Sequence, residues 1–145
     1  MKLLVQRVSE ASVKVGGQEI ASINEGVLVF VGFDRGDKSD KLKILADKLL
    51  NYKIFNDKEG KVGLSLLTTQ NDILLVPQVT LSVGTNKGTK PSFSMAAPPD
   101  LGEELFLSFI TILENKFKKI QLGQFGADMS VNLINEGPIT FWFDL

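Results

Sequence analysis

Histidine and cysteine are both absent from the 145-residue chain. Without them the protein cannot use a Ser-His-Asp or Cys-His arrangement for nucleophilic catalysis. The usual zinc sites are excluded as well, because they are built from cysteine and histidine. The lack of cysteine also excludes a disulfide framework, and we therefore expect a cytoplasmic protein. Any proton transfer must use a carboxylate, an amine, a phenol, a backbone group, water or the substrate itself.

Long apolar runs and an excess of one charge are also missing. No stretch approaches the length of a membrane span, and Gln6 and Arg7 end the first apolar run too early for a signal peptide. With 16 basic and 17 acidic residues the net charge is −1, which argues against coating nucleic acid through bulk positive charge. A local patch can still bind one end of an RNA. We expect one globular domain over residues 1–145, with no metal, cofactor or membrane partner.

The apolar pattern predicts an α+β fold with largely antiparallel sheets, barrel-like or sandwich-like, and two main helices. One helix is expected over 41–52 and another from Pro99 onward, because apolar residues recur there at helical spacing. Strand-like patterns occupy the remaining apolar segments, namely 2–8, 11–15, 18–23, 27–33, 53–55, 72–83, 125–134 and 139–143.

Two features do not fit this regular pattern. Pro77 lies inside the segment 72–83 and cannot donate a ladder hydrogen bond, so it predicts an edge, a bulge or a break. Residues 84–99 form a long polar stretch without periodicity, which is typical of a functional or mobile loop. The tetrapeptide INEG occurs at 23–26 and again at 134–137, where Pro138 follows. We expect two similar turns.

Several short motifs, taken in order, resemble those of the D-aminoacyl-tRNA deacylases, formerly called D-tyrosyl-tRNA deacylases. The three most specific are PQVTL at 77–81, KGTKPSF at 87–93 and NEGPIT at 135–140. Further matches are QRVSEASVKV near the start, NDKEGKVGLSL in the middle, AAPPDLGEELF before the second helix and FGADMSVNL near the end. The resemblance covers nearly the whole chain.

The resemblance implies a homodimeric esterase that removes D-amino acids, and glycine from mischarged tRNA, from the 3′ adenosine of tRNA without a cofactor. It implies that Gly137 and Pro138 form a chiral filter with a cis peptide bond. Their carbonyls would enter the partner subunit's site and exclude L-side chains.

The motif PQVTL departs from the family pattern Ser-Gln-Phe-Thr-Leu at two positions. Pro77 replaces the serine, so a hydroxyl and a backbone N–H are lost. Val79 replaces the phenylalanine. Lys90 stands where the family has arginine; it keeps the charge but cannot make a planar two-pronged contact.

The resemblance makes Thr80 and Gln78 the candidate catalytic residues. Thr80 is a nucleophile, an orienting group or an ordinary strand threonine, and nothing like histidine is available to deprotonate it. Gln78 either touches the substrate or ties down the loop. We prefer a mechanism in which the tRNA 2′-hydroxyl helps to activate water while the protein positions the ester and stabilises charge.

Further residues of these motifs are candidates for binding substrate or tRNA. Phe93 is suited to stacking on the terminal adenine, or packs within its loop. Lys87 and Lys90 are suited to phosphate contacts, or are solvated loop charges. The other candidates are Pro77, Leu81, Ala96 and Ala97. The small side chains of the alanines either leave room for the adenosine or shape a turn. The rival hypothesis is a dimeric nucleic-acid-binding protein on the same scaffold that has lost catalysis.

Overall fold

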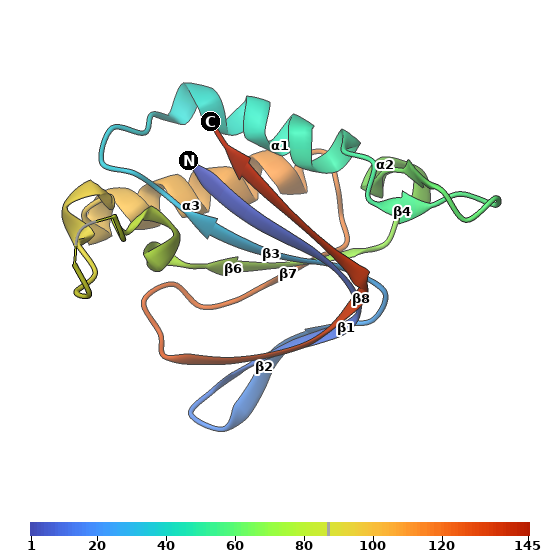
Figure 1. Ribbon diagram of the computed structural model, residues 1–145, viewed down its shortest axis with the longest axis horizontal. Helices are drawn as coiled ribbons and strands as arrows, with labels where there is room; N and C mark the ends of the chain where they lie inside the picture. The colour runs from blue at the N-terminus through green and yellow to red at the C-terminus, as the bar shows by residue number, and fades with distance from the viewer. Residues whose placement is uncertain (87) are drawn as a thin grey trace.

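The computed structural model describes residues 1–86 and 88–145 (Figure 1). Six strands form the main sheet, and two short strands form a separate hairpin. The strands are β1 (Lys2–Val15), β2 (Gln18–Ile23), β3 (Gly26–Gly32), β4 (Phe55–Asn56), β5 (Val62–Leu64), β6 (Asp72–Pro77), β7 (Ile120–Leu122) and β8 (Met129–Asp144). The helices are α1 (Leu42–Asn51), α2 (Leu66–Thr69) and α3 (Pro99–Glu114), and three 3-10 turns are η1 (Ser39–Lys41), η2 (Val79–Ser82) and η3 (Phe93–Met95).

Strand β1 organises the main sheet. Its first half pairs with β3, its second half pairs with β2, and β8 pairs with it along nearly its whole length. All of these pairings are antiparallel, whereas β3–β6 and β6–β7 are parallel. The sheet curls strongly, so that β2 and the first half of β8 fold back beneath β3 and β6 (Figure 1). This nearly closed, barrel-like α+β sheet with two main helices confirms the predicted fold class.

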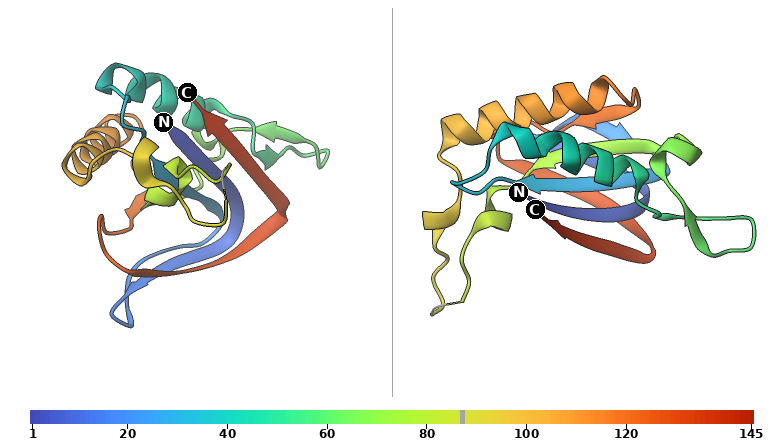
Figure 2. Two further views of the ribbon diagram at one scale, coloured as in Figure 1. Left: turned by 60° about the vertical axis from the view of Figure 1, so that its left-hand side comes forward. Right: turned by 90° about the horizontal axis from the view of Figure 1, so that it is seen from above.

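Two apolar cores hold the curled sheet in place. The larger core lies between one face of the sheet and the helices α1 and α3, which both cover that face (Figure 2). The smaller core fills the inside of the curl with side chains from β1, β2, β3 and β6. Strand β3 contributes to both cores, Val29 to the larger and Leu28 to the smaller, as its continuous apolar run predicts. The expected helical stripe of α1 is buried as well.

Several predicted boundaries are corrected. Residues 2–15 form one strand rather than two, with irregular register against β8 around Val8. The segment predicted as a strand over 72–83 stops at Pro77, after which η2 begins, so the proline marks a break. The second INEG lies within β8 instead of forming a turn between two strands. No described helix is long and apolar enough to cross a membrane.

Candidate functional site

A cavity of about 450 Å³ opens at the end of the sheet where β3 and β6 finish. Three predicted site residues, Pro77, Gln78 and Ala97, contribute to its wall. The rest of the wall comes from the end of β3, the start of α3 and the segment that leads into β8, including Phe33, Pro99, Gly102, Phe125, Asp128 and Met129. The cavity thus brings together residues from four separate parts of the chain.

The turn η2 forms one side of this cavity because β3 leaves room for it. The backbone N–H of Gln78 donates to the carbonyl of Val31 at 2.7 Å, which attaches the turn to the end of β3. Gly32 faces η2 at close range: a Cβ atom there would lie 2.9 Å from the Gln78 carbonyl oxygen and from the Leu81 Cβ. Leu81, on the side of the turn that faces β3, therefore packs against Gly32.

The Gly32 contact makes a first prediction. Replacing Gly32 by alanine is expected to lower the free energy of unfolding by about 1–3 kcal/mol, because η2 must move away from β3. The same displacement should reduce any activity of the cavity. Gly36→Ala is the matched control, since a Cβ there meets nothing within 4 Å. Urea unfolding measures both variants, and equal stability of the two would contradict the packing argument.

Gln78 and Thr80 form a hydrogen-bonded pair at the cavity. Gln78 Nε2 donates to Thr80 Oγ1 at 2.5 Å, and Thr80 is exposed. An amide N–H cannot take a proton from a hydroxyl, so this pair does not activate Thr80 as a nucleophile. Within the described part of the chain, the backbone N–H groups of Val79 and Thr80 make no hydrogen bond. They are the unpaired donors expected at the start of a 3-10 turn and are available to a ligand.

Pro77 lies where a backbone donor would be of little use. The N–H of Gln78 points toward β3, so residue 77 faces the β7 side. The β6–β7 ladder ends earlier, with Gly123 N–H donating to the Leu75 carbonyl at 2.8 Å. A Cβ atom on Gly123 would lie 3.4 Å from the Pro77 Cδ and 3.1 Å from the Met129 sulfur. The proline ring therefore lies against Gly123, the residue after β7, and contributes to the cavity wall.

The candidate residues in the loop after η2 differ in their exposure and in whether they line the cavity. Gly84 and Ser92 exchange two backbone hydrogen bonds, and the described residues between them are exposed, Lys90 among them. This segment projects from one end of the molecule (Figure 2). Phe93 is 52% exposed, Ala97 lines the cavity and Ala96 is buried behind it. Lys87 lies outside the described residues.

Gly137 and Pro138 lie in the irregular middle of β8, and the peptide bond between them is cis. Both residues are exposed, and Gly137 has a φ of +122°. The Arg7 Nε donates to the Glu136 carbonyl at 3.1 Å, while its Nη1 donates to the Ile54 carbonyl and to Asn56 Oδ1. Arg7 therefore attaches the Gly137-Pro138 segment to β4 and to Ile54, the residue before it.

This segment and the cavity lie at opposite ends of the sheet. Gly32, beside η2, pairs with Lys2, whereas Glu136 is held by Arg7. Five residues of strand separate Lys2 from Arg7, which corresponds to roughly 16 Å. A single chain does not bring Gly137-Pro138 to its own cavity.

Sequence reasoning did not single out four residues that the structure places at these features. Phe125, Met129 and Gly102 line the cavity, and Arg7 holds the Gly137-Pro138 segment. Phe125 and Met129 belong to FGADM and Arg7 to QRV, so each lies inside a stretch that carries the resemblance. The sequence does not show that these stretches contact the site, because none of them is near 77–81 in the chain.

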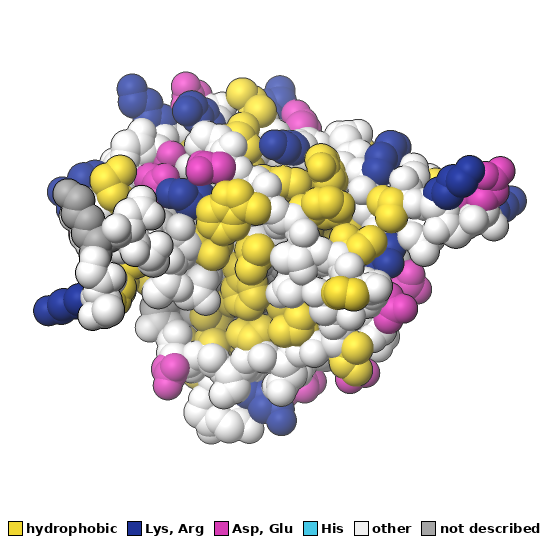
Figure 3. Space-filling model, in the orientation of Figure 1, with side chains coloured by type: hydrophobic (Ala, Val, Ile, Leu, Met, Phe, Trp, Pro, Cys, Tyr) yellow, Lys and Arg dark blue, Asp and Glu magenta, His cyan; other side chains and the backbone are white. Residues whose placement is uncertain are grey.

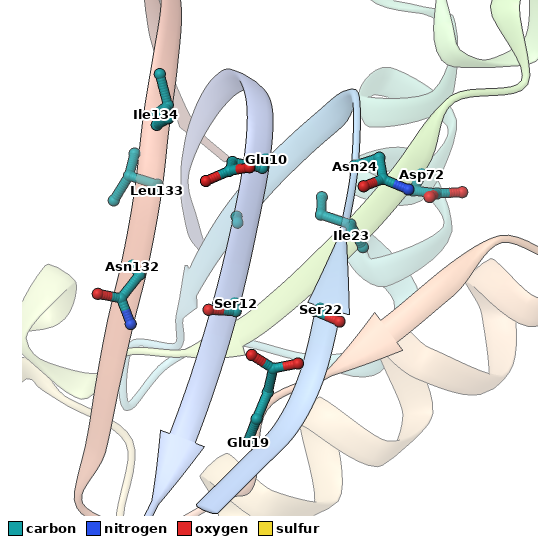
Figure 4. Close-up of a pocket in the computed structure, with 11 residues that line it drawn as sticks. Glu10, Ser12, Glu19, Ser22, Ile23, Asn24, Asp72, Asn132, Leu133 and Ile134 are labelled. Atoms are coloured by element: carbon teal, nitrogen blue, oxygen red, sulfur yellow. The ribbon is translucent and has the colours of Figure 1, made fainter. Parts of the chain in front are cut away.

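A second cavity of about 520 Å³ lies on the outer face of β1, β2 and β8 (Figure 4). It shares no residue with the predicted site. Side chains of Glu10, Glu19 and Asp72 stand around it, and the opposite side is formed by Asn132 and Ile134. Three carboxylates repel the phosphates of a nucleic acid. We therefore assign the candidate site to the smaller cavity at η2.

Comparison with known proteins agrees with the motif resemblance. A family model described as D-Tyr-tRNA(Tyr) deacylase matches residues 4–144. A D-aminoacyl-tRNA deacylase of Teredinibacter turnerae is 46% identical over 144 residues, which cover 99% of both chains. A D-aminoacyl-tRNA deacylase of Francisella tularensis subsp. tularensis is 44% identical over the full length of both chains.

Two solved structures resemble the whole fold. One is described as a c-Myc DNA unwinding element binding protein; it is 38% identical, with a TM-score of 0.96, and the match covers 100% of this chain and 99% of that one. The other is described as a probable eukaryotic D-amino acid tRNA deacylase, with 19% identity and a TM-score of 0.84 over 99% and 98% of the chains. The second match shows the fold alone. From the family model and the full-length relatives, the chain belongs to the D-Tyr-tRNA(Tyr) deacylase family of hydrolases.

Proposed function

We propose that this enzyme hydrolyses the ester between a D-amino acid, or glycine, and the 3′ adenosine of tRNA, in the cytoplasm. The observation that carries the proposal is the pair of unpaired N–H groups of Val79 and Thr80 beside a cavity that is large enough for a nucleoside. The test is deacylation of matched D- and L-aminoacyl-tRNA and of glycyl-tRNA. Rapid cleavage of the D- and glycyl esters with sparing of the L-ester supports the proposal.

The chemical step requires water to attack the ester carbonyl and the 3′ oxygen of the tRNA to leave. Negative charge develops on the carbonyl oxygen, and the N–H groups of Val79 and Thr80 are suited to stabilise it. The tRNA 2′-hydroxyl beside the ester helps to activate the water, because no base contacts Thr80 among the described residues. Thr80 and Gln78 then orient the ester.

The Thr80→Ala variant separates orientation from nucleophilic catalysis. Loss of one neutral hydrogen bond corresponds to about 1 kcal/mol, so kcat is expected to fall by roughly five- to tenfold. A nucleophile would instead cost about 10⁴-fold or more. Single-turnover deacylation of D-aminoacyl-tRNA measures the difference. A fall of the larger size, in a variant that unfolds at the same urea concentration as the wild type, would contradict the orienting role.

The cavity is suited to the terminal adenosine. Ala97 and Gly102 leave it open, and Phe125 and Met129 offer apolar surface to a base. Phe93 stands exposed on the neighbouring turn η3, where it can stack on an adjacent nucleotide. We propose that Lys90, and Lys87 with it, contact the tRNA phosphates.

We propose further that two copies of the chain form the active dimer. Strand β8 pairs with β1 alone among the described strands, which leaves its other edge without a neighbour. Trp142 is 50% exposed and pairs with Leu4 of β1, which in turn pairs with Phe30 of β3. Hydrophobic side chains form a band across this face (Figure 3). A long uncovered edge and an exposed apolar face both favour a second copy of the chain.

In the proposed dimer, Gly137 and Pro138 of one subunit act in the cavity of the other. Their exposure and their distance from their own cavity support this arrangement. Gly137 carries no Cβ, so its backbone carbonyl can approach the α-carbon of the bound amino acid closely. An L-side chain would then collide with the carbonyls, while a D-side chain would point away. The hydrogen bond from Arg7 to the Glu136 carbonyl supports a fixed position of the segment.

A mixing experiment tests whether the two parts act between subunits. Ala97→Trp blocks the cavity and Gly137→Ala disturbs the filter, so each homodimer should be inactive. In a heterodimer of the two variants, one site combines a wild-type cavity with a wild-type filter. Co-expressed, doubly tagged heterodimer should therefore recover roughly half of the wild-type activity.

The opposite arrangement gives a different result. If cavity and filter of the same chain acted together, both sites of the heterodimer would carry a defect and no activity would return. A heterodimer of Ala97→Trp with wild type is the control for assembly, and it should also show roughly half of the activity.

The second candidate function is nucleic-acid binding without catalysis. It is favoured by the 38% identical structure described as a DNA unwinding element binding protein. Absence of turnover on D-aminoacyl- and glycyl-tRNA, together with retained binding of uncharged tRNA or DNA in a filter assay, would favour it over the deacylase.

A further inference from the structure

Residues 35–41 lead from β3 into α1 and lie beside the turn η3, at the cavity end of the sheet (Figure 1). Arg35 N–H donates to the Met95 carbonyl at 2.8 Å, and Ala97 N–H donates to the Phe33 carbonyl at 2.9 Å. Ala97 lines the cavity, and Met95 is two residues away from it, which is about 7 Å along an extended chain. Backbone contacts therefore hold the 35–41 segment at the rim of the cavity.

The carboxylates nearest to this rim point inward and are already paired. Both oxygens of Asp34 accept hydrogen bonds from Lys2 Nζ. The Asp37 side chain is 8% exposed, and it accepts hydrogen bonds from the Met1 amine at 3.0 Å and from the Asp34 backbone N–H at 2.7 Å. These two negative charges are therefore compensated inside the protein and contribute little to the potential outside it.

Three cations of the 35–41 segment have no such partner. Arg35, Lys38 and Lys41 are exposed, and none of them forms a salt bridge with a described residue. Lys41 N–H donates to the Lys38 carbonyl at 3.3 Å, so these two lysines lie one turn apart at η1. Asp40 is the one exposed carboxylate of this segment. The segment therefore presents a surplus of positive charge to solvent.

The helix that follows η3 carries the opposite charge. Asp100, Glu103 and Glu104 are exposed in the first turns of α3, which starts beside the cavity. Phosphates are repelled from these carboxylates and attracted to the 35–41 segment. Phe93 on η3 is 52% exposed and offers an aromatic face to a base. Charge therefore favours one path for an RNA strand that leaves the cavity over η3.

We propose that Arg35, Lys38 and Lys41 bind backbone phosphates of the tRNA acceptor end, next to the nucleotide that occupies the cavity. The inference rests on the proposed function, because it assumes that the terminal adenosine lies in the cavity. Basic side chains beside an aromatic surface are a common arrangement for following a nucleic-acid strand. The contacts set the direction in which the strand leaves and add affinity without reading its sequence.

A triple variant, Arg35→Ala with Lys38→Ala and Lys41→Ala, tests the proposal. On D-tyrosyl-tRNA at about 0.1 M salt, kcat/KM should fall by at least about tenfold, while the single-turnover rate at saturating enzyme stays within about twofold of wild type. The plot of log Kd for uncharged tRNA against log salt concentration should lose about two to three units of slope, because three phosphate contacts are removed. D-Tyrosyl-adenosine carries no phosphate, so the variant should cleave it at the wild-type rate.

The matched control replaces the lysines of another cluster, Lys116, Lys118 and Lys119, by alanine. These residues follow the far end of α3, roughly 24 Å from its start at the cavity. Both triple variants change the net charge from −1 to −4, so a general effect of net charge is equal in the two. The control should keep kcat/KM for D-tyrosyl-tRNA within about threefold of wild type and leave the salt dependence unchanged.

Binding of uncharged tRNA separates this inference from the proposed function. If the wild-type enzyme cleaves no D-ester, the deacylase proposal fails, and the Kd values of the two triple variants in a filter assay still decide whether the 35–41 segment binds RNA. A third variant, Arg35→Lys with Lys38→Arg and Lys41→Arg, keeps all three charges. Its Kd for tRNA should stay within about threefold of wild type.

Three results would overturn the inference. The first is an equal loss of tRNA affinity in the two alanine variants, which would indicate a general effect of net charge. The second is an unchanged salt slope in the first variant. The third is a parallel loss of activity on D-tyrosyl-adenosine, which would show that the substitutions disturb the cavity itself. If the first variant unfolds at a lower urea concentration than the wild type, Lys38→Ala takes its place: a slope change of about one supports the contact, and no change overturns it.

Discussion

Gly137→Ala is expected to lower kcat/KM for D-aminoacyl-tRNA by about 100-fold and to weaken the preference for the D-ester. A Cβ atom at Gly137 would lie 2.9 Å from Arg7 Nη2 and 3.1 Å from Ile139 Cγ1. The φ of +122° adds strain for any residue that has a side chain. Since Arg7 also holds the Glu136 carbonyl, the new methyl group displaces the segment from the contacts that orient it.

The control for this variant is Gly60→Ala. Gly60 also has a positive φ, +79°, but a Cβ there meets nothing within 4 Å. It should therefore cost about 1 kcal/mol of stability without affecting selectivity. Single-turnover rates on matched D- and L-tyrosyl-tRNA measure both variants. A Gly137→Ala enzyme with the wild-type D/L ratio would contradict a filter at this position.

Replacing the terminal 2′-hydroxyl of the tRNA by hydrogen is expected to slow cleavage of the D-ester by about 10²- to 10⁴-fold, the usual range for loss of general acid–base assistance. The chain has no histidine, and the contact made by Thr80 is to an amide donor. In the proposed mechanism the 2′-hydroxyl of the substrate therefore assists the proton transfer that water needs. The N–H groups of Val79 and Thr80 would still stabilise the charge on the carbonyl oxygen.

This experiment requires a correction and a binding control. The spontaneous hydrolysis of each ester is measured without enzyme and subtracted, because the 2′-hydroxyl also affects the uncatalysed reaction. Affinity for the deoxy substrate should remain within a few-fold of the normal one, since the cavity wall is mostly apolar. If the enzyme cleaved the normal and the deoxy substrate at rates equal to within about threefold, the 2′-hydroxyl mechanism would be excluded. A group of the protein would then have to activate the water.

The sequence was informative wherever local periodicity and buried surface coincide. The stripe of α1 and the doubly buried strand β3 were predicted from spacing alone, because each element buries the face that its own pattern defines. Pro77 predicted an edge, a bulge or a break, and the structure has the break, since the missing N–H and fixed φ of proline act locally. Local steric and apolar effects are encoded in neighbouring residues.

Prediction was weaker where partners are distant in sequence. Strand β1 was divided at Ser9 and Glu10 because polar residues interrupt its pattern, although pairing with β8 continues on both sides. The three-residue strand β7 and its parallel pairing with β6 left no local signal. Partner choice in a sheet depends on the whole arrangement of strands, so a pattern in one segment cannot reveal it.

The candidate site shows the same division. Motifs within the chain identified the family, the pair Gln78 and Thr80, and the segment Gly137-Pro138, because short-range chemistry resides in the residues themselves. The folded structure added the unpaired N–H groups at η2, the hold of Arg7 on Glu136 and the backbone bridge between Asp34 and Ala96. It also separated the cavity from Gly137-Pro138 by the length of the sheet. These are relations between residues far apart in the chain, and only the curl of the sheet and the packing of η2 on Gly32 set them.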